Sequence, residues 1–318
     1  MKRAIFILLC FLLLAEKPTE ASPIKISFLD NEDAIKQTTD FLLAKGCDRE
    51  AVSSFRRVID WYNLTPTDLD LKKFPLRENG FYLFQSVSNL VEALPHPLIY
   101  TYHQNELNCF DTVILLAGSL INTKLQPDDI SGPFLSPFTA TNNDVTLRVA
   151  ATPRDAFAVI CPPWWVEASK NIFSESMQNK RICLMAAFDS FYFLPDSTTR
   201  ENLRGILLKI LQSNWKRQGI TFPTNAKVVI YHSVALNEHN SLTSHAGLLF
   251  QDHNQYVYIE KAGASGPYVR LDFKNKSDLL TWHKAGIKPT TDKGNFLFAT
   301  FNDQEIEALN DVPENEAQ

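Results

Sequence analysis

The chain has 318 residues and a formal net charge of −5, and 45% of its residues are hydrophobic, so it can bury a substantial core. No run of five like charges occurs, and the lack of a basic tract argues against nucleic acid as a partner. No P-loop, GxGxxG or GxSxG motif is present, which leaves nucleotide binding and serine hydrolysis without support.

The N-terminus has the pattern of a secretory signal peptide. A basic start at Lys2 and Arg3 is followed by an apolar run that ends near Ala15. The run is too short to span a membrane, and we predict a signal peptide over 1–21 with cleavage after Ala21. We therefore expect export to a periplasm or out of the cell, with no membrane segment after cleavage. A lipoprotein anchored through Cys10 is a weaker alternative, because few apolar residues precede it.

Residues 22–98 are expected to form a helical N-terminal region. Apolar residues recur there at helical spacing, as Val52, Phe55 and Ile59 do. The predicted helices cover three ranges: 31–44, 48–62 and 81–94.

Residues 99–290 are expected to form a second region, which contains a helix from Cys109 to about Leu120. A long insert at about 123–225 follows, with three predicted elements: a helix over 168–179, a strand over 181–187, and a helix over 199–218 capped by Asp196 or Ser197. Four consecutive antiparallel strands and a last helix are then predicted: 227–235, 246–250, 256–262, 268–273 and 277–284. Residues 291–318 are expected to be a C-terminal segment with a partly disordered tail. This order predicts an α+β fold in which the Cys109 helix packs on an antiparallel sheet.

The start of the Cys109 helix is suited to a nucleophile. Asn108 is a good N-cap, and Asp111 sits three positions later, as in a capping box built from shorter residues. The first helical turn offers unpaired amides and the positive end of the helix dipole, which favour a thiolate and can stabilise an oxyanion. The negative charge of Asp111 works against the thiolate, so a histidine partner is needed. The alternative is a buried structural cysteine.

His245 is the predicted partner. It stands between a polar loop and an apolar strand, and the following Ala246-Gly247 pair leaves space for another backbone or a substrate. Glu260 ends the next strand, and antiparallel pairing would bring it near His245, where a carboxylate orients the imidazole. The alternatives for Glu260 are an exposed strand end or a partner of Lys261.

The remaining histidines and cysteines point to no cofactor. The histidines at 232, 239, 245 and 253 match no regular ligand spacing, so no metal site is expected. We expect His232 in the core, with an auxiliary position facing the site as the alternative, and His283 in solvent. Cys161 and Cys183 are the best candidates for a disulfide, if one forms.

These residues carry a resemblance to a known family. Cys109 at a helix start, the run 245–250 and the segments 258–262 and 266–268 together resemble the NlpC/p60-type papain-like cysteine peptidases and amidases. More narrowly they are similar to an uncharacterised bacterial family, domain of unknown function 4300. The resemblance covers about 105–120 and 227–285.

The resemblance implies a papain-like core with Cys109 as nucleophile, His245 as base and Glu260 as the orienting residue. Tyr102 is then a candidate to stabilise the oxyanion. It also implies an exported cysteine hydrolase that cleaves an amide bond, with the stem peptides of the bacterial cell wall as the first substrate to consider. The residues around Cys109 and the long insert depart from the compact members of the family. A non-catalytic envelope or secreted binding protein on the same fold is therefore the alternative.

Overall fold

The computed structural model describes nine stretches of the chain: residues 23–62, 71–94, 107–126, 157–158, 172–188, 190–252, 255–262, 267–286 and 295–306. The predicted signal peptide, Tyr102, Cys161 and two stretches of the insert, 127–156 and 159–171, lie outside these described residues. Within them, no helix is both long and apolar enough to cross a membrane.

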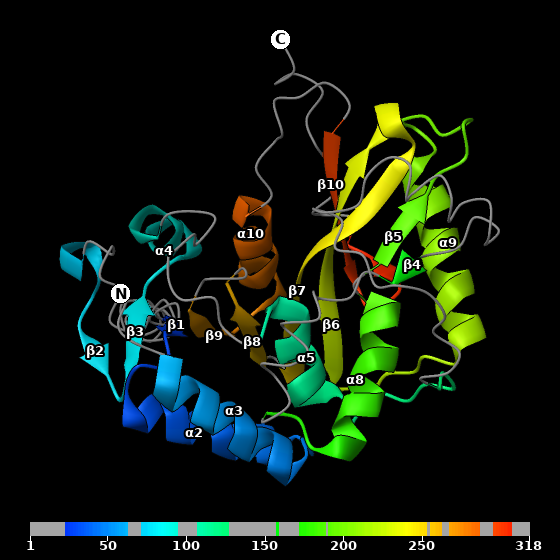
Figure 1. Ribbon diagram of the computed structural model, residues 1–318. Helices are drawn as coiled ribbons and strands as arrows, with labels where there is room; N and C mark the ends of the chain where they lie inside the picture. Colours follow the sequence, from blue (N-terminus) through cyan, green and yellow to red (C-terminus); the bar gives the residue numbers. More distant parts are fainter. Residues whose placement is uncertain are drawn as a thin grey trace, which may run out of the picture.

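A single large antiparallel sheet organises the described residues (Figure 1). The strand order is β11-β10-β6-β7-β8-β9-β1-β3-β2, and β5 pairs with both β4 and β7. The strands are β1 (Ile24–Ser27), β2 (Arg77–Glu78), β3 (Phe81–Phe84), β4 (Phe157–Ala158), β5 (Ser190–Phe193), β6 (Ala226–Ala235), β7 (Asn240–Asp252), β8 (Gln255–Lys261), β9 (Tyr268–Phe273), β10 (Asn295–Phe301) and β11 (Gln304–Glu305). The four consecutive strands predicted from the sequence are confirmed as β6 to β9, which pair in that order.

Helices cover both faces of this sheet. Successive residues of a strand enter different apolar clusters, as Leu248 and Leu249 of β7 do, because strand side chains alternate between faces. The first cluster contains residues of five helices: α2 (Glu32–Ala44), α3 (Arg49–Tyr62), α5 (Cys109–Ala117), α8 (Glu175–Phe188) and α9 (Leu203–Gln218). The second contains residues of α4 (Val87–Ala93) and α10 (Lys276–Gly286). Two short 3₁₀ turns complete the elements, η1 (Leu71–Lys73) and η4 (Leu236–Glu238). The expected α+β class is confirmed.

Helix α5 lies at the centre of the molecule (Figure 1). All nine of its residues are buried, and it contacts α3, α8, β7 and β8. A helix that is apolar on nearly every side is typical of a buried element rather than a surface one. Its first turn is therefore buried as well, and the helix packs on β7 and β8.

Two predicted elements are wrong. The range 81–94 is not one helix: an aromatic strand, β3, pairs with β1, and Ser86 then caps α4 by accepting a hydrogen bond from the Asn89 amide at 3.2 Å. The range 181–187 is not a strand but part of α8. A short apolar run does not distinguish a buried strand from a buried helix, and here the helix packs between α5, α9 and the sheet.

Other boundaries differ more modestly. α9 begins at Leu203 after Asn202, four residues later than predicted, and neither Asp196 nor Ser197 is its N-cap. β1 and β10 were not predicted. β10 falls in the range expected to be a C-terminal segment, and it pairs with β6 over seven residues.

Candidate active site

The N-terminus of α5 has the predicted cap. The Asn108 Oδ1 accepts a hydrogen bond from the Asp111 amide at 2.7 Å, and the Asp111 Oδ2 accepts one from the Asn108 amide at 3.3 Å. The reciprocal pair is a capping box, so Cys109 occupies the first position of the helix. Cys109 carries a free thiol and is only 6% exposed.

The structure brings His245 and Glu260 to this thiol. The last residue pair between β7 and β8 is Gly247 with Glu260, and Gly247 lies two residues after His245 in the chain. On the other side of β7, His245 pairs with Tyr231 of β6. The His245 Nε2 donates to the Glu260 Oε2 at 2.6 Å, and the His245 ring also hydrogen-bonds the Cys109 side chain. Since Nε2 is engaged with Glu260, Nδ1 is the nitrogen left for the thiol.

Electrostatics favour a charged His245. Burial disfavours the imidazolium, but the charge and hydrogen bond of Cys109, together with those of Glu260, outweigh it and raise the pKa of His245 to about 10. For Glu260, burial likewise opposes the charged form, and the hydrogen bond from His245 overcomes it, so the pKa of this carboxyl lies below its usual value. The His245 side chain is 23% exposed and that of Glu260 is 10% exposed. His245 is therefore protonated near neutral pH while it is hydrogen-bonded to the Cys109 side chain.

Glu260 has a second donor that the sequence did not reveal. The Tyr258 hydroxyl donates to the same Oε2 at 2.9 Å. The tyrosine ring lies over Gly247, where a Cβ would come within 2.1 Å of the hydroxyl oxygen. The space beside His245 that was expected to admit a backbone or a substrate is therefore filled by Tyr258. The two alternatives for Glu260 are also wrong, because it is buried and its partners are His245 and Tyr258.

His283 of α10 is also part of this site, contrary to the expectation that it faces solvent. It is 1% exposed, its Nδ1 is hydrogen-bonded to the Tyr231 hydroxyl, and its ring lies 4.7 Å from that of Tyr258. Burial lowers the pKa of His283 to about 4, so the ring is neutral near neutral pH. His283 lies next to β6 and β8 because α10 packs there. The residues around His283 in the sequence do not indicate that packing.

Buried charged side chains lie next to the N-terminus of α5. Arg181 of α8 donates from Nε to the Asp111 Oδ1 at 2.7 Å, and both side chains are buried. This contact offsets the negative charge that appeared to oppose a thiolate at Cys109. Lys261 is also fully buried; burial lowers its pKa to about 8, although Cys109 and Asp111 oppose that shift.

The other predicted residues lie elsewhere. His232 is fully buried in the core, as expected, with the Thr300 Oγ1 3.5 Å from its Nε2. In the described part of the chain, no group of three or more His, Cys, Asp or Glu side chains is placed to hold a metal ion. Tyr102 lies outside the described residues, and so does Cys161, so the oxyanion candidate and the disulfide with Cys183 stay predictions.

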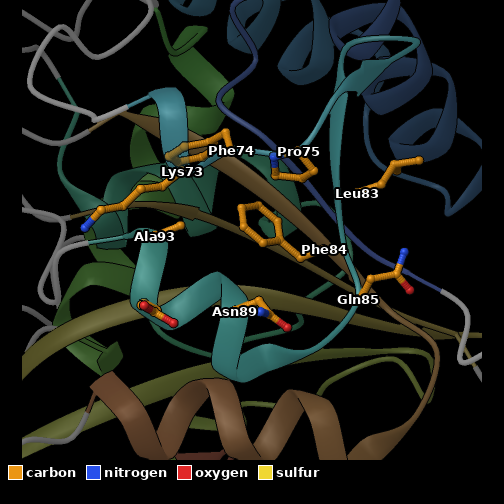
Figure 2. Close-up of a pocket in the computed structure, with 9 residues that line it drawn as sticks. Lys73, Phe74, Pro75, Leu83, Phe84, Gln85, Asn89 and Ala93 are labelled. Atoms are coloured by element: carbon orange, nitrogen blue, oxygen red, sulfur yellow. The ribbon is translucent and has the colours of Figure 1, made fainter.

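A pocket of about 470 Å³ is formed by other residues of the chain (Figure 2). Phe74, Phe84 and Asn89 are among its lining residues, which come from η1, β3, α4 and the adjoining turns. None of Cys109, His245 and Glu260 lines it. The pocket is therefore separate from the cysteine, the histidine and the carboxylate.

Comparison with known proteins gives one match. Residues 172–303 match a domain of unknown function, DUF4300. No curated protein and no solved structure matches the chain. The match names no chemistry and gives no link to the NlpC/p60-type enzymes. The matched region contains His245 and Glu260, whereas Cys109 lies outside it, so this chain is similar to DUF4300 in the part that carries the histidine and the carboxylate.

Proposed function

We propose that this protein is a papain-like cysteine hydrolase that cleaves an amide bond. The observation that carries the proposal is the contact of His245 with both Cys109 and Glu260. The nucleophile lies at the N-terminus of a buried helix, and the base and its carboxylate lie on neighbouring antiparallel strands. Nucleophile, base and orienting group in hydrogen-bond contact are the parts that covalent acyl transfer requires.

The reaction follows from these contacts. The Cys109 sulfur attacks the carbonyl carbon, and the tetrahedral intermediate collapses to a thioester as the C–N bond breaks. His245 gives its proton to the leaving amine. It then accepts a proton from water, whose oxygen attacks the thioester, and the carboxylic acid leaves as the C–S bond breaks. Glu260 keeps the imidazole in place and stabilises its charged form in both halves of the reaction.

The oxyanion is stabilised by the start of α5. The N–H of Cys109 belongs to the first turn of the helix, where the helix itself provides no carbonyl to accept it. This donor and the positive end of the helix dipole lie next to the position where negative charge develops on the carbonyl oxygen. Tyr102 is the candidate for a second donor.

Peptide stems of bacterial cell-wall peptidoglycan are the substrate we propose to test first. The support is the resemblance to NlpC/p60-type enzymes together with the export expected from the N-terminal sequence. The same residues can hydrolyse or transfer another acyl group, so the bond has to be identified from the products.

Thiol reactivity tests the chemistry without knowledge of the substrate. Cys47 is a matched internal control, since it is also free and is 5% exposed against 6% for Cys109, while burial raises its pKa to about 12. We expect iodoacetamide to modify Cys109 well below pH 8 and to leave Cys47 unmodified, with each site followed by mass spectrometry. His245→Ala should abolish the fast reaction of Cys109. Equal, slow modification of both cysteines in the native protein would leave the non-catalytic binding protein as the better explanation.

Product analysis tests the substrate. Purified cell-wall fragments are incubated with the native protein and with Cys109→Ala, and the products are identified by mass spectrometry. New peptide fragments with the native protein alone support the peptidoglycan assignment. A reactive Cys109 without such products would remove that assignment and keep the cysteine chemistry.

A further inference from the structure

A ring of aromatic and imidazole side chains lies behind His245 and Glu260. Tyr258 donates to Glu260 and meets His283 edge-on, with ring centroids 4.7 Å apart and an interplanar angle of 84°. His283 is hydrogen-bonded to Tyr231, whose ring lies 5.7 Å from that of His245. These contacts start at Glu260 and return to the histidine that Glu260 binds.

We propose that Tyr258 and His283 are positioning residues that hold Glu260 and Tyr231 against His245 and thereby maintain the reactive state of Cys109. Neither residue contacts the reacting atoms directly. The inference rests on the proposed cysteine chemistry and adds to it the residues that keep the imidazole aligned.

Two donors fix the orientation of the carboxylate. The Glu260 Oε2 accepts two hydrogen bonds, at 2.6 Å from His245 and at 2.9 Å from Tyr258. A buried carboxylate with one donor can rotate about its side-chain bonds, whereas two donors on one oxygen define its orientation. The absence of a side chain at Gly247 is what allows Tyr258 to reach this position. Tyr258 therefore sets the distance and angle of the bond between Glu260 and His245.

Tyr231 flanks the imidazole on another side. Burial, with a contribution from the Glu260 charge, raises the pKa of the Tyr231 hydroxyl, so this group keeps its proton and donates to the His283 Nδ1. His283 can accept because it is neutral, and a charged His283 would also repel the charged His245. A neutral, buried His283 thus holds Tyr231 beside His245 without competing for Glu260.

The titratable groups around His245 come from four elements. They are Cys109 of α5, Tyr231 of β6, Glu260 and Tyr258 of β8, and His283 of α10. Of these, Tyr258 and Tyr231 stay protonated near neutral pH and His283 stays neutral, so the charges that act on His245 are those of Cys109 and Glu260. A variant that changes only Tyr258, Tyr231 or His283 should therefore change the reactivity of Cys109 through Glu260.

The test is the rate of Cys109 alkylation as a function of pH. Tyr258→Phe keeps the ring and removes one donor, and its matched control is Tyr82→Phe, a buried tyrosine of the same apolar cluster on β3. We expect Tyr258→Phe to raise the pH at which alkylation of Cys109 begins by about one unit. At a fixed pH below that point, alkylation should then be roughly tenfold slower than in the native protein. Tyr82→Phe should leave the pH profile unchanged.

His283 has its own matched control. His283→Phe is compared with His232→Phe, another buried histidine with a pKa lowered by burial, to about 3, which contacts Tyr192 and Phe298 instead of the site. We expect both variants to change stability and only His283→Phe to shift the alkylation profile. His283→Asn keeps an acceptor for the Tyr231 hydroxyl and should restore most of the native profile.

The outcomes separate the positioning role from the chemistry beneath it. Slow alkylation of Cys109 in the native protein, equal to that of Cys47, would overturn the cysteine chemistry itself. If Cys109 reacts fast in the native protein, and Tyr258→Phe changes the pH profile of alkylation as little as Tyr82→Phe does, the positioning role alone is overturned. If His283→Phe does not fold, Tyr258→Phe decides, because it loses a single oxygen atom and keeps the packing of the ring.

Discussion

Gly247→Ala is the substitution whose effect can be worked out most directly from the structure. The added Cβ would lie 2.1 Å from the hydroxyl oxygen of Tyr258 and 2.3 Å from its Cζ, whereas ordinary contacts begin at 3.4 Å. The φ of Gly247 is not in the left-handed region, so alanine can adopt the same backbone conformation. The substitution is therefore unfavourable only because of the clash with Tyr258. The phenol must retreat by about 1.3 Å to accommodate the new atom.

That displacement exceeds what the hydrogen bond to Glu260 tolerates. A 2.9 Å bond can lengthen by only about 0.6 Å before its geometry no longer counts as a hydrogen bond. We therefore expect Gly247→Ala to lose this bond and to lower the free energy of unfolding by about 1–3 kcal/mol, as overpacking of a core does. Cys109 alkylation should slow by the amount expected for Tyr258→Phe.

A double-mutant cycle isolates the cause. Free energies of unfolding are measured by urea denaturation for the native protein, Gly247→Ala, Tyr258→Ala and the double variant. The three atoms nearest to the added methyl group all belong to the Tyr258 side chain, and Tyr258→Ala removes them. Gly247→Ala should therefore change the free energy of unfolding by close to nothing in the Tyr258→Ala background. Equal costs of Gly247→Ala in the two backgrounds would refute the reasoning, because the clash with Tyr258 would then not be its source.

Three further predictions concern buried charge and pH. Arg181→Met should lower the free energy of unfolding by about 3–5 kcal/mol, because Asp111 is left buried without this partner. Adding Asp111→Leu should recover part of that loss in the same urea titration. If the double variant is as unstable as Arg181→Met, the loss of this ion pair is not the cause. The pKa values of His283 and His232, about 4 and about 3, lie below the unfolded value near 6.5, so the unfolded chain takes up protons first and stability falls as the pH drops through 6.5 toward these values. His283→Phe should flatten this loss by up to about 3 kcal/mol in unfolding measured against pH, and an equally steep loss in the variant would exclude His283 as its source. The pKa of His245, about 10, lies above its unfolded value near 6.5. The stability that the charged His245 contributes is therefore complete below about pH 6.5 and is lost as the pH rises through 10. His245→Gln should remove this alkaline loss of stability, which is measured by thermal unfolding at a series of pH values.

Several predictions that depend on neighbouring residues were confirmed, although the cap predicted for α9 was not. The capping box of Asn108 and Asp111 spans three positions, and both of its hydrogen bonds form. The strands β6 to β9 follow from β-branched and aromatic runs between turn residues. Caps and alternation act within a few residues, so the sequence alone contains the information that they need.

Predictions that require a choice between packing partners were wrong. The residues at 81–84 form a strand because β1 offers its edge, and those at 181–187 form a helix because α5 and α9 pack against it. Both stretches are apolar, and an apolar stretch satisfies either structure until its neighbours are known. β10 was missed for a related reason, since its partner β6 lies far away in the sequence.

The candidate site divides in the same way. Cys109, His245 and Glu260 could be selected from the sequence because a helix start and a hairpin restrict where their side chains lie. The second donor to Glu260, the imidazole of His283 and the guanidinium of Arg181 could not, because contacts between elements place them there. The local sequence determined which groups are the candidates, and only the tertiary packing decided which buried partners set their charge and orientation.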